Sequence, residues 1–287
     1  MHLPPPPHAL VHARPAQRQF IRRHALTVRI THWLNVLCLS LLLMSGLQIF
    51  NAHPRLYWGK YGADADQPWI AIGTRQQGDA AQGFFEIGRL RIETTGWLGV
   101  SDENGTATAR AFPAWLTVPS YHDLGAGRRW HFFFAWLLVF NGLVYLVHGL
   151  WRRHFQRDLL PSRDQLAPRH LWQEIRDHAR LRFARGDAAR RYNALQKLSY
   201  LAVVFGLLPM MVLTGLTMSP GLDAAFPFLA DLFGGRASAR SLHFISAALL
   251  VLFVAVHVAM VIASGLWNNL RSMLSGRYAI TDEGDKT

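Results

Sequence analysis

Four long apolar segments constrain the fold of this chain more than any other feature. A helix needs about 20 apolar residues to cross the hydrocarbon core of a bilayer. Four segments reach that length: residues 30–50, 130–151, 198–218 and 242–266. We therefore predict an all-α integral membrane protein whose four spans form one helical bundle. Pro209 lies inside the third span and predicts a kink there, because proline leaves a carbonyl of the preceding turn without its partner.

The distribution of positive charge predicts which way the bundle faces. The chain carries 30 lysines and arginines and a net charge of +12. Cytoplasmic loops of membrane proteins are enriched in these two residues. Twenty of the 30 lie before the first span, between the second and third spans, or after the fourth. Both termini and the loop between spans two and three are thus expected in the cytoplasm, beside an anionic membrane surface rather than nucleic acid.

This orientation divides the chain into a four-helix membrane domain and two cytoplasmic tails. The tails cover residues 1–29 and 267–287, and the membrane domain covers residues 30–266. No short apolar region with a small-residue cleavage site precedes the first span, so no removable signal peptide is expected. The one cysteine, Cys38, lies in an apolar segment and is expected to pack there. A disulfide framework and a CxxCH haem attachment site are thereby excluded.

The longest loop, residues 51–129, is expected on the periplasmic side. Aromatic and glycine clusters around Tyr57, Phe84 and Trp97 stand among mixed charges in it. We expect this loop to fold against the outer end of the bundle. It would serve as a docking platform for an external partner, or as a cap that only shields the bundle.

The cytoplasmic loop, residues 152–197, contains a predicted amphipathic helix at residues 168–185. Its apolar side chains share one face opposite arginines: Leu171, Trp172, Ile175 and Ala179. Such a helix lies either at a membrane surface or on an ordinary soluble surface.

Four histidines at membrane depth are the candidate functional residues. His243 and His257 are fourteen residues apart in the fourth span, which places them within about 40° of one face and about 21 Å apart along the helix. Under the predicted orientation His131 shares the outer depth of His243, and His32 shares the inner depth of His257. Two axial imidazoles per iron is a common haem b ligation that leaves no open coordination position. The four histidines therefore predict two b-type haems that transfer electrons.

His148 is the alternative partner for His257. It follows His131 by seventeen residues, which rotates it by about 100° around the helix, and it would instead face a quinone or a haem propionate. A faint repeat favours His32: Arg-Arg-Trp-His-Phe opens the second span much as Arg-Ser-Leu-His-Phe opens the fourth, which aligns Tyr145 with His257. Zinc is not expected, because the histidines form two separate layers without Cys, Asp or Glu beside them.

Other residues near these histidines suit the same chemistry. Ser45-Gly46 near the end of the first span resembles Thr214-Gly215 near the end of the third. The two glycines leave room for a porphyrin ring or for another helix. Four arginines lie two or three residues from a proposed ligand, which is close enough to pair with haem propionates: Arg29, Arg128, Arg129 and Arg240. Asn35 and Asn141 need partners at membrane depth, and we expect them to bond between helices.

The combined pattern resembles the bacterial cytochrome b561 family. The similar features are Arg-x-x-His-Trp in the first span, Ser-Gly near its end, Arg-x-x-His-Phe in the fourth span and its two histidines fourteen apart. The family includes the membrane cytochrome b subunits of nickel-iron hydrogenases, formate dehydrogenases and thiosulfate reductases. The resemblance implies a four-helix di-haem protein that exchanges electrons with membrane quinone. His131 and His243 would hold the outer haem, and His32 and His257 the inner one.

The expected function is that of an electron-transfer subunit in the bacterial inner membrane. Its partner would be a periplasmic oxidoreductase of the molybdenum enzyme or hydrogenase type, and an oligomer is compatible with the sequence. His148, Asn35 and Arg153 are candidates for the quinone site from their expected inner location alone. One alternative is a free-standing quinone-coupled cytochrome b that acts on a small diffusible redox partner. Another, a transporter or haem-free scaffold, predicts a colourless protein.

Overall fold

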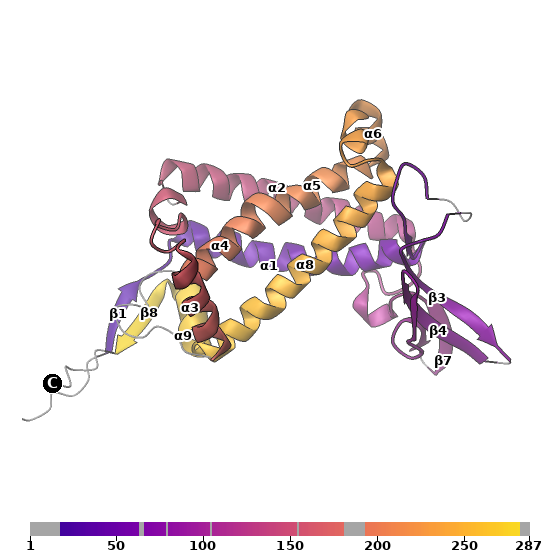
Figure 1. Cartoon of the computed structure of the whole chain (residues 1–287), viewed down its shortest axis with the longest axis horizontal. Helices are drawn as coiled ribbons and strands as arrows, with labels where there is room; N and C mark the ends of the chain where they lie inside the picture. The colour runs from indigo at the N-terminus through magenta and orange to yellow at the C-terminus, as the bar shows by residue number, and fades with distance from the viewer. Residues whose placement is uncertain are drawn as a thin grey trace, which may run out of the picture.

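The computed structural model describes residues 18–62, 66–78, 80–103, 105–153, 155–180 and 193–281. Four long apolar helical segments run alongside one another as a bundle, with strands at both ends (Figure 1). They are α1 (Leu26–Asn51), α2 (Leu124–Trp151), the segment Ala194–Thr217 and α8 (Arg236–Ala263). The prediction of four membrane-length helices is confirmed. Residues 1–17 and 282–287 of the predicted tails lie outside the described residues.

All four helical segments begin earlier than their apolar segments, and for α2 and the third segment a polar cap decides where the helix starts. The Asp123 carboxylate accepts a hydrogen bond from the Ala126 amide at 2.8 Å, and α2 starts at residue 124 instead of 130. The third segment starts at residue 194 because Asn193 and Gln196 form a reciprocal capping box before it. At the other end, α8 stops at residue 263 because Gly265 turns the chain with a φ of 110°.

The third segment is irregular, as Pro209 predicts. It consists of α4 (Ala194–Ala202), a π-helical turn η4 (Val203–Leu207) and α5 (Leu208–Thr217). The carbonyl that Pro209 leaves without a helical partner belongs to Phe205, which lies inside this wider turn. The distortion therefore takes the form of a π-bulge.

The chain is mostly helical, but the expectation of an all-α protein is met only in part, because the loop after α1 is rich in strands. We call residues 52–123 the β-rich insertion. One antiparallel sheet has the order β2 (Arg55–Leu56), β3 (Ile70–Gln77), β4 (Ala80–Ile87), β5 (Leu90–Glu93). A second hairpin joins β6 (Gly99–Glu103) to β7 (Thr106–Arg110), and a short helix η1 (Ala114–Leu116) follows. The two longest strands, β3 and β4, have eight residues each and are interrupted by Gly73 and Gly83, while the others have two to five residues. The sequence therefore lacks the long alternation of apolar and polar residues that indicates strands.

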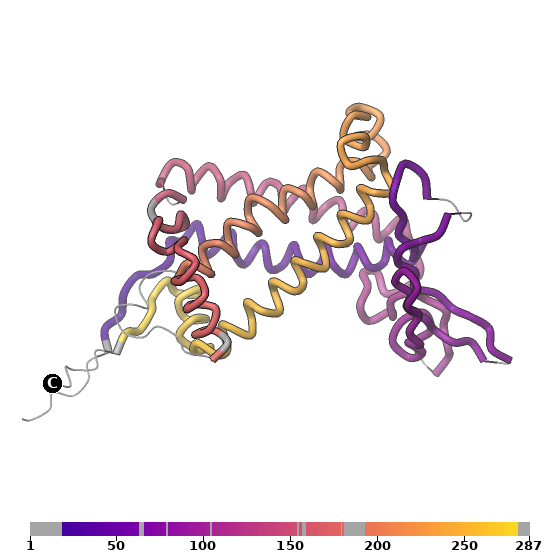
Figure 2. The backbone as a smooth tube through the Cα atoms, viewed as in Figure 1, coloured from indigo at the N-terminus to yellow at the C-terminus, as the bar shows by residue number. Residues whose placement is uncertain are grey.

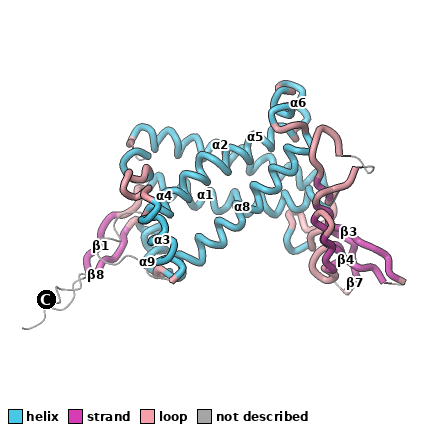
Figure 3. The backbone as a smooth tube through the Cα atoms, in the orientation of Figure 1, coloured by secondary structure: helices cyan, strands magenta, loops and turns pink. Residues whose placement is uncertain are grey.

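The β-rich insertion packs against one end of the bundle, as expected of this loop. Its core joins Leu56, Ile70 and Ile72 to Phe50 at the end of α1, and Phe244 of α8 packs against the same cluster. Figure 3 shows the strands of the insertion beside the helix ends. The short helices α6 (Pro220–Ala225) and α7 (Phe228–Leu232) connect α5 to α8 near this end (Figure 1).

Segments predicted as tails form regular structure at the opposite end of the bundle. Strand β1 (Arg18–Arg22) pairs antiparallel with β8 (Arg277–Thr281), so the two described ends of the chain lie side by side (Figure 2). Helix α9 (Leu266–Ser275) connects α8 to β8. Each predicted tail thus supplies one strand of a shared two-stranded ribbon.

The cytoplasmic loop predicted at residues 152–197 is also partly regular. It contains a π-helical turn η2 (Phe155–Leu159) and the helix α3 (Pro168–Ala179). The predicted amphipathic helix is present up to residue 179, and residues 181–185 lie outside the described residues. Trp172 and Ile175 of α3 are exposed in the absence of a membrane.

The bundle consists of two helix pairs, in agreement with the repeat. Helix α1 packs chiefly against α2, and α5 packs against α8. Cys38 is fully buried between α1 and α2, which confirms its predicted packing. The Asn141 amide donates hydrogen bonds to the Asn35 side chain at 2.7 Å and to the Thr31 carbonyl at 2.9 Å. The predicted interhelical role of these two asparagines is thereby confirmed.

Candidate functional site

Two pairs of histidine rings face one another at opposite ends of α8. His131 of α2 and His243 of α8 have ring centroids 6.3 Å apart, and Phe244, the residue after His243, packs against the core of the β-rich insertion. His32 of α1 and His257 of α8 have ring centroids 6.4 Å apart, at the other end of the bundle, where Arg29 and Trp33 bond the end of α9. Helix α8 therefore contributes one histidine to each pair, as the spacing of fourteen residues predicts.

Hydroxyl groups orient the rings of the His131–His243 pair. The Ser45 hydroxyl lies 3.1 Å from Nδ1 of His131, and the Thr214 hydroxyl lies 3.0 Å from Nδ1 of His243. Each hydroxyl also lies 2.6 Å from the carbonyl oxygen four residues earlier in its helix, to which it donates its proton. Each oxygen must therefore accept a hydrogen bond from Nδ1–H, which leaves Nε2 unprotonated and free to bind a metal.

The glycines that follow these hydroxyl residues make room for the same rings. A Cβ atom on Gly46 would lie 3.4 Å from Cε1 of His131, and one on Gly215 would lie 3.4 Å from Cε1 of His243. Close approach to a neighbouring helix, one of the two roles that the sequence leaves open, is thus observed at both glycines. The repeated Ser/Thr-Gly pair supports a histidine of the adjacent helix, once in each half of the bundle.

The His32–His257 pair has different surroundings. Nδ1 of His32 is buried and has no hydrogen-bond partner. Its ring contacts Trp33 edge-on, with centroids 5.4 Å apart, while the His257 ring stacks on Phe253 at 5.9 Å. Aromatic rings thus pack against both imidazoles.

The spacing of both pairs fits two axial ligands on one iron. A metal–imidazole bond is about 2 Å long, and the ring centre lies about 1 Å beyond the nitrogen, so two opposed axial imidazoles have centroids about 6 Å apart. Within the described ranges, no group of three or more His, Cys, Asp or Glu side chains lies together in a way that could hold a metal ion. Each pair therefore offers two imidazoles, as a haem with bis-histidine ligation requires.

His148 is not part of either ring pair in the described part of the chain. It lies near the end of α2, where its carbonyl accepts a hydrogen bond from the Arg152 amide at 3.0 Å. His257 instead contacts His32, which is the arrangement that the repeat favours.

The four candidate arginines have different partners. Arg29 donates from Nε to the Met273 carbonyl at 3.4 Å and from Nη2 to the Leu274 carbonyl. Arg240 donates to the His53 carbonyl at 2.5 Å. Arg128 lies over the ring of Phe132, and Arg129 is exposed. Backbone carbonyls therefore engage two of the four, and Arg128 and Arg129 are better placed for a propionate.

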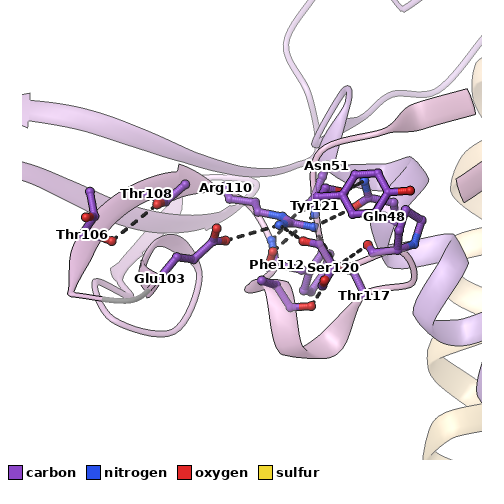
Figure 4. Close-up of polar contacts among 12 residues, drawn as sticks. Gln48, Asn51, Glu103, Thr106, Thr108, Arg110, Phe112, Thr117, Ser120 and Tyr121 are labelled. Atoms are coloured by element: carbon purple, nitrogen blue, oxygen red, sulfur yellow. Dashed lines mark hydrogen bonds and ion pairs between the residues drawn. The ribbon is translucent and has the colours of Figure 1, made fainter. Parts of the chain in front are cut away.

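Arg110 is a buried residue that sequence reasoning missed. Its guanidinium donates to Gln48 at 2.6 Å, to Thr117 at 2.7 Å and to the Ser120 carbonyl at 2.5 Å, and it pairs with Glu103 at 3.3 Å (Figure 4). Because Gln48 belongs to α1, this network fastens the β-rich insertion to the bundle one turn from Ser45. A lone arginine at the end of a short strand gives no sequence signal for such a role.

A four-span helical membrane protein with two opposed pairs of imidazoles has the architecture of a b-type cytochrome. A family model described as prokaryotic cytochrome b561 matches residues 23–276, so the chain belongs to this family. The putative protein-methionine-sulfoxide reductase subunit YedZ1 of Azospira oryzae is 29% identical over 238 residues, which cover 83% of this chain and 89% of that protein. No solved structure matches the chain.

Family membership and the four apolar helices establish the coarse function. The chain is an integral membrane protein of electron transport that carries haem b. Its resemblance to an oxidoreductase subunit over most of both chains fits a role within an oxidoreductase system.

Proposed function

We propose that this protein is a di-haem subunit that carries electrons between the membrane quinone pool and a periplasmic oxidoreductase. The observation that supports two haems is the presence of two imidazole pairs. Each pair takes one histidine from α8, and each has the centroid spacing expected of a bis-histidine iron. Haem b, when bound, supplies a one-electron iron couple whose axial positions are both filled, which suits electron transfer. The protein supplies ligation, orientation and exclusion of water.

The residues have distinct roles in this proposal. His131 and His243 hold the haem near the β-rich insertion, and His32 and His257 hold the haem at the opposite end. Ser45 accepts a hydrogen bond from the imidazole of His131, and Thr214 accepts one from the imidazole of His243. Each hydroxyl fixes the tautomer and the orientation of its imidazole. His148, the alternative haem ligand, is instead proposed to lie at the quinone site together with Arg153.

The β-rich insertion faces the periplasm and docks the partner in this proposal. The excess of lysine and arginine at the other end of the bundle supports this orientation, with both termini in the cytoplasm. Tyr61 and Trp97 of the insertion are exposed by 79% and 75%, and exposed aromatic residues are enriched at protein interfaces. Shielding of the bundle alone would not require such aromatic side chains on the surface.

The relative named above suggests the partner class and the direction of electron flow. Its name refers to reduction of methionine sulfoxide in proteins. A reductase of this kind consumes electrons, so we propose quinol as the donor, the two haems as carriers and a methionine-sulfoxide reductase as the acceptor. The sequence alone leaves open a molybdenum enzyme or a hydrogenase as the partner. The relative favours a partner that takes up electrons to reduce its substrate.

Haem content and optical spectra test this function directly. We expect the purified protein to hold two b-type haems per chain by the pyridine haemochrome assay, and to show a reduced-minus-oxidised spectrum on addition of a quinol. A colourless protein would overturn the proposal. Co-purification of a soluble periplasmic subunit tests the partner, and its absence under gentle extraction would favour a free-standing cytochrome.

A further inference from the structure

The two helices that carry His32 and His257 do not chiefly pack on one another. Helix α1 packs chiefly against α2, while α8 packs against α5. Their rings nevertheless lie with centroids 6.4 Å apart. Another part of the molecule must therefore hold these two helices in register at this end.

Helix α9 makes the connection that is needed. After α8 ends, Gly265 turns the chain so that α9 runs across this end of the bundle (Figure 1). Its last carbonyls then receive hydrogen bonds from α1: Arg29 donates to Met273 and Leu274, and the Trp33 indole donates to Met273 at 3.2 Å. These two donors lie on either side of His32 in the sequence.

The segment after α9 closes the connection on its other side. The Asn268 side chain donates to the Ala279 carbonyl at 2.8 Å and accepts from the Ala279 amide at 2.9 Å, which fixes β8 against α9. Strand β8 pairs with β1, and the Arg23 amide donates to the Gly276 carbonyl at 2.9 Å. Since β1 leads directly into α1, the start of α1 is held from two sides. Its Arg29 and Trp33 bond α9, and the strand before it pairs with β8.

We propose that residues 266–281 form a C-terminal clasp that positions His32 opposite His257. Arg29 and Trp33 are then positioning residues that act through the carbonyl end of α9, and Arg29 is not a propionate partner. The clasp rests on the proposed haem site at this pair. It gives the C-terminal segment a defined role in building the haem site farthest from the β-rich insertion.

A substitution of Gly276 can weaken the contact between α9 and α1 without removing the Arg29 side chain. Its φ is 80°, and a Cβ atom there would lie 3.2 Å from Nη1 of Arg29 and 3.2 Å from the His24 carbonyl. Gly276→Ala, Arg29→Met and the double variant should be purified as full chains. We expect about 10-fold weaker retention of the His32–His257 haem in each single variant, with a shift in its EPR g values and midpoint potential. The double variant should be no worse than the more affected single variant, because both changes loosen the same junction between α1 and the end of α9.

Two further variants keep the test decisive. Trp33→Phe removes the indole N–H group that bonds Met273 and keeps a smaller aromatic ring beside His32, so it should shift the same EPR signal even if the other variants accumulate poorly. Arg169→Met, which removes an exposed arginine of α3, should leave both haem signals unchanged.

The outcomes separate the clasp from the proposed function. If Arg29→Met alters the haem and Gly276→Ala does not, Arg29 binds a propionate and the clasp is wrong. If both haems are present and the His32–His257 signal is unchanged in Gly276→Ala, Arg29→Met and Trp33→Phe, the clasp proposal fails and the proposed haem site stands. If His32→Ala and His257→Ala both leave the haem content unchanged, the proposed haem site fails and the clasp fails with it.

Discussion

The two histidine pairs are built in different ways, although both join α8 to another helix. In the His131–His243 pair, each Nδ1 has a hydroxyl acceptor on the helix that packs beside it. In the His32–His257 pair, Nδ1 of His32 is buried without a partner, and the neighbouring side chains are aromatic. One pair is thus fixed from within the bundle, whereas the other depends on contacts with α9.

This difference has an electronic consequence. A hydrogen bond from Nδ1–H makes an imidazole more basic and so stabilises the ferric state of an iron that it ligates. This effect alone gives the His131–His243 haem the lower midpoint potential. The comparison therefore predicts two haems that can be told apart by potential and by EPR.

Substitution of the four proposed histidine ligands should have the largest effect on haem content. It tests most directly whether the two pairs are separate haem sites. His131→Ala and His243→Ala should each abolish the same haem, the one of lower potential, because a bis-histidine iron loses half of its axial ligation. His32→Ala and His257→Ala should each abolish the other haem. Optical titration of the purified variants would measure both losses. His148→Ala is the control: if it abolishes the second haem and His32→Ala does not, the pairing is wrong.

The Arg110 network should give the next largest effect. Arg110→Leu leaves the buried acceptors of Gln48 and Thr117 without their donor, which costs about 3 kcal/mol. We expect thermal loss of the His131–His243 haem at lower temperature and faster proteolysis within the β-rich insertion, with the other haem little changed. The matched control is Arg91→Leu, which removes an exposed ion pair with Glu86 worth about 0–1 kcal/mol. Equal effects of the two variants would contradict this anchoring role.

The sequence predicts the four spans and the shared face of His243 and His257 because both depend on periodicity within single helices. The length of an apolar segment identifies a span, and the fourteen-residue spacing places His243 and His257 on one face. The Ser45-Gly46 and Thr214-Gly215 repeat also indicates a shared role, although it does not reveal that each hydroxyl contacts an imidazole. These features survive in sequence because they need only the local geometry of a helix.

Contacts between distant segments could not be predicted in the same way. Strand β1 pairs with β8 more than 250 residues away, and neither segment has a pattern that indicates its partner. Arg29 lies near a proposed ligand, which suggests a propionate, yet its guanidinium meets the carbonyl end of α9. Proximity in sequence therefore does not reveal which acceptor the tertiary fold brings to this guanidinium.

Loss of the hydroxyl acceptors should have a moderate effect and sharpens the electronic part of the comparison. Ser45→Ala and Thr214→Val should each raise the midpoint potential of the His131–His243 haem, because its imidazole becomes less basic, and weaken haem retention about 10-fold. Potentiometric titration measures both haems in one sample. Ser40→Ala is the control, since Ser40 only donates to the Val36 carbonyl of the same helix. A lowered potential, or an equal shift in the other haem, would contradict the proposed orientation.

The smallest effect is expected at the glycine beside His131. A Cβ atom on Gly46 would lie 3.4 Å from the imidazole, a tight contact that a slight tilt of the ring can relieve. Gly46→Ala should therefore keep both haems and shift only the EPR g values of the His131–His243 haem. Gly142→Ala of α2 is matched in helix propensity, but its Cβ atom would have no neighbour within 4 Å. If both substitutions shift the signal alike, helix stiffness rather than ring contact is responsible, and Gly46 would not belong to the support of this pair.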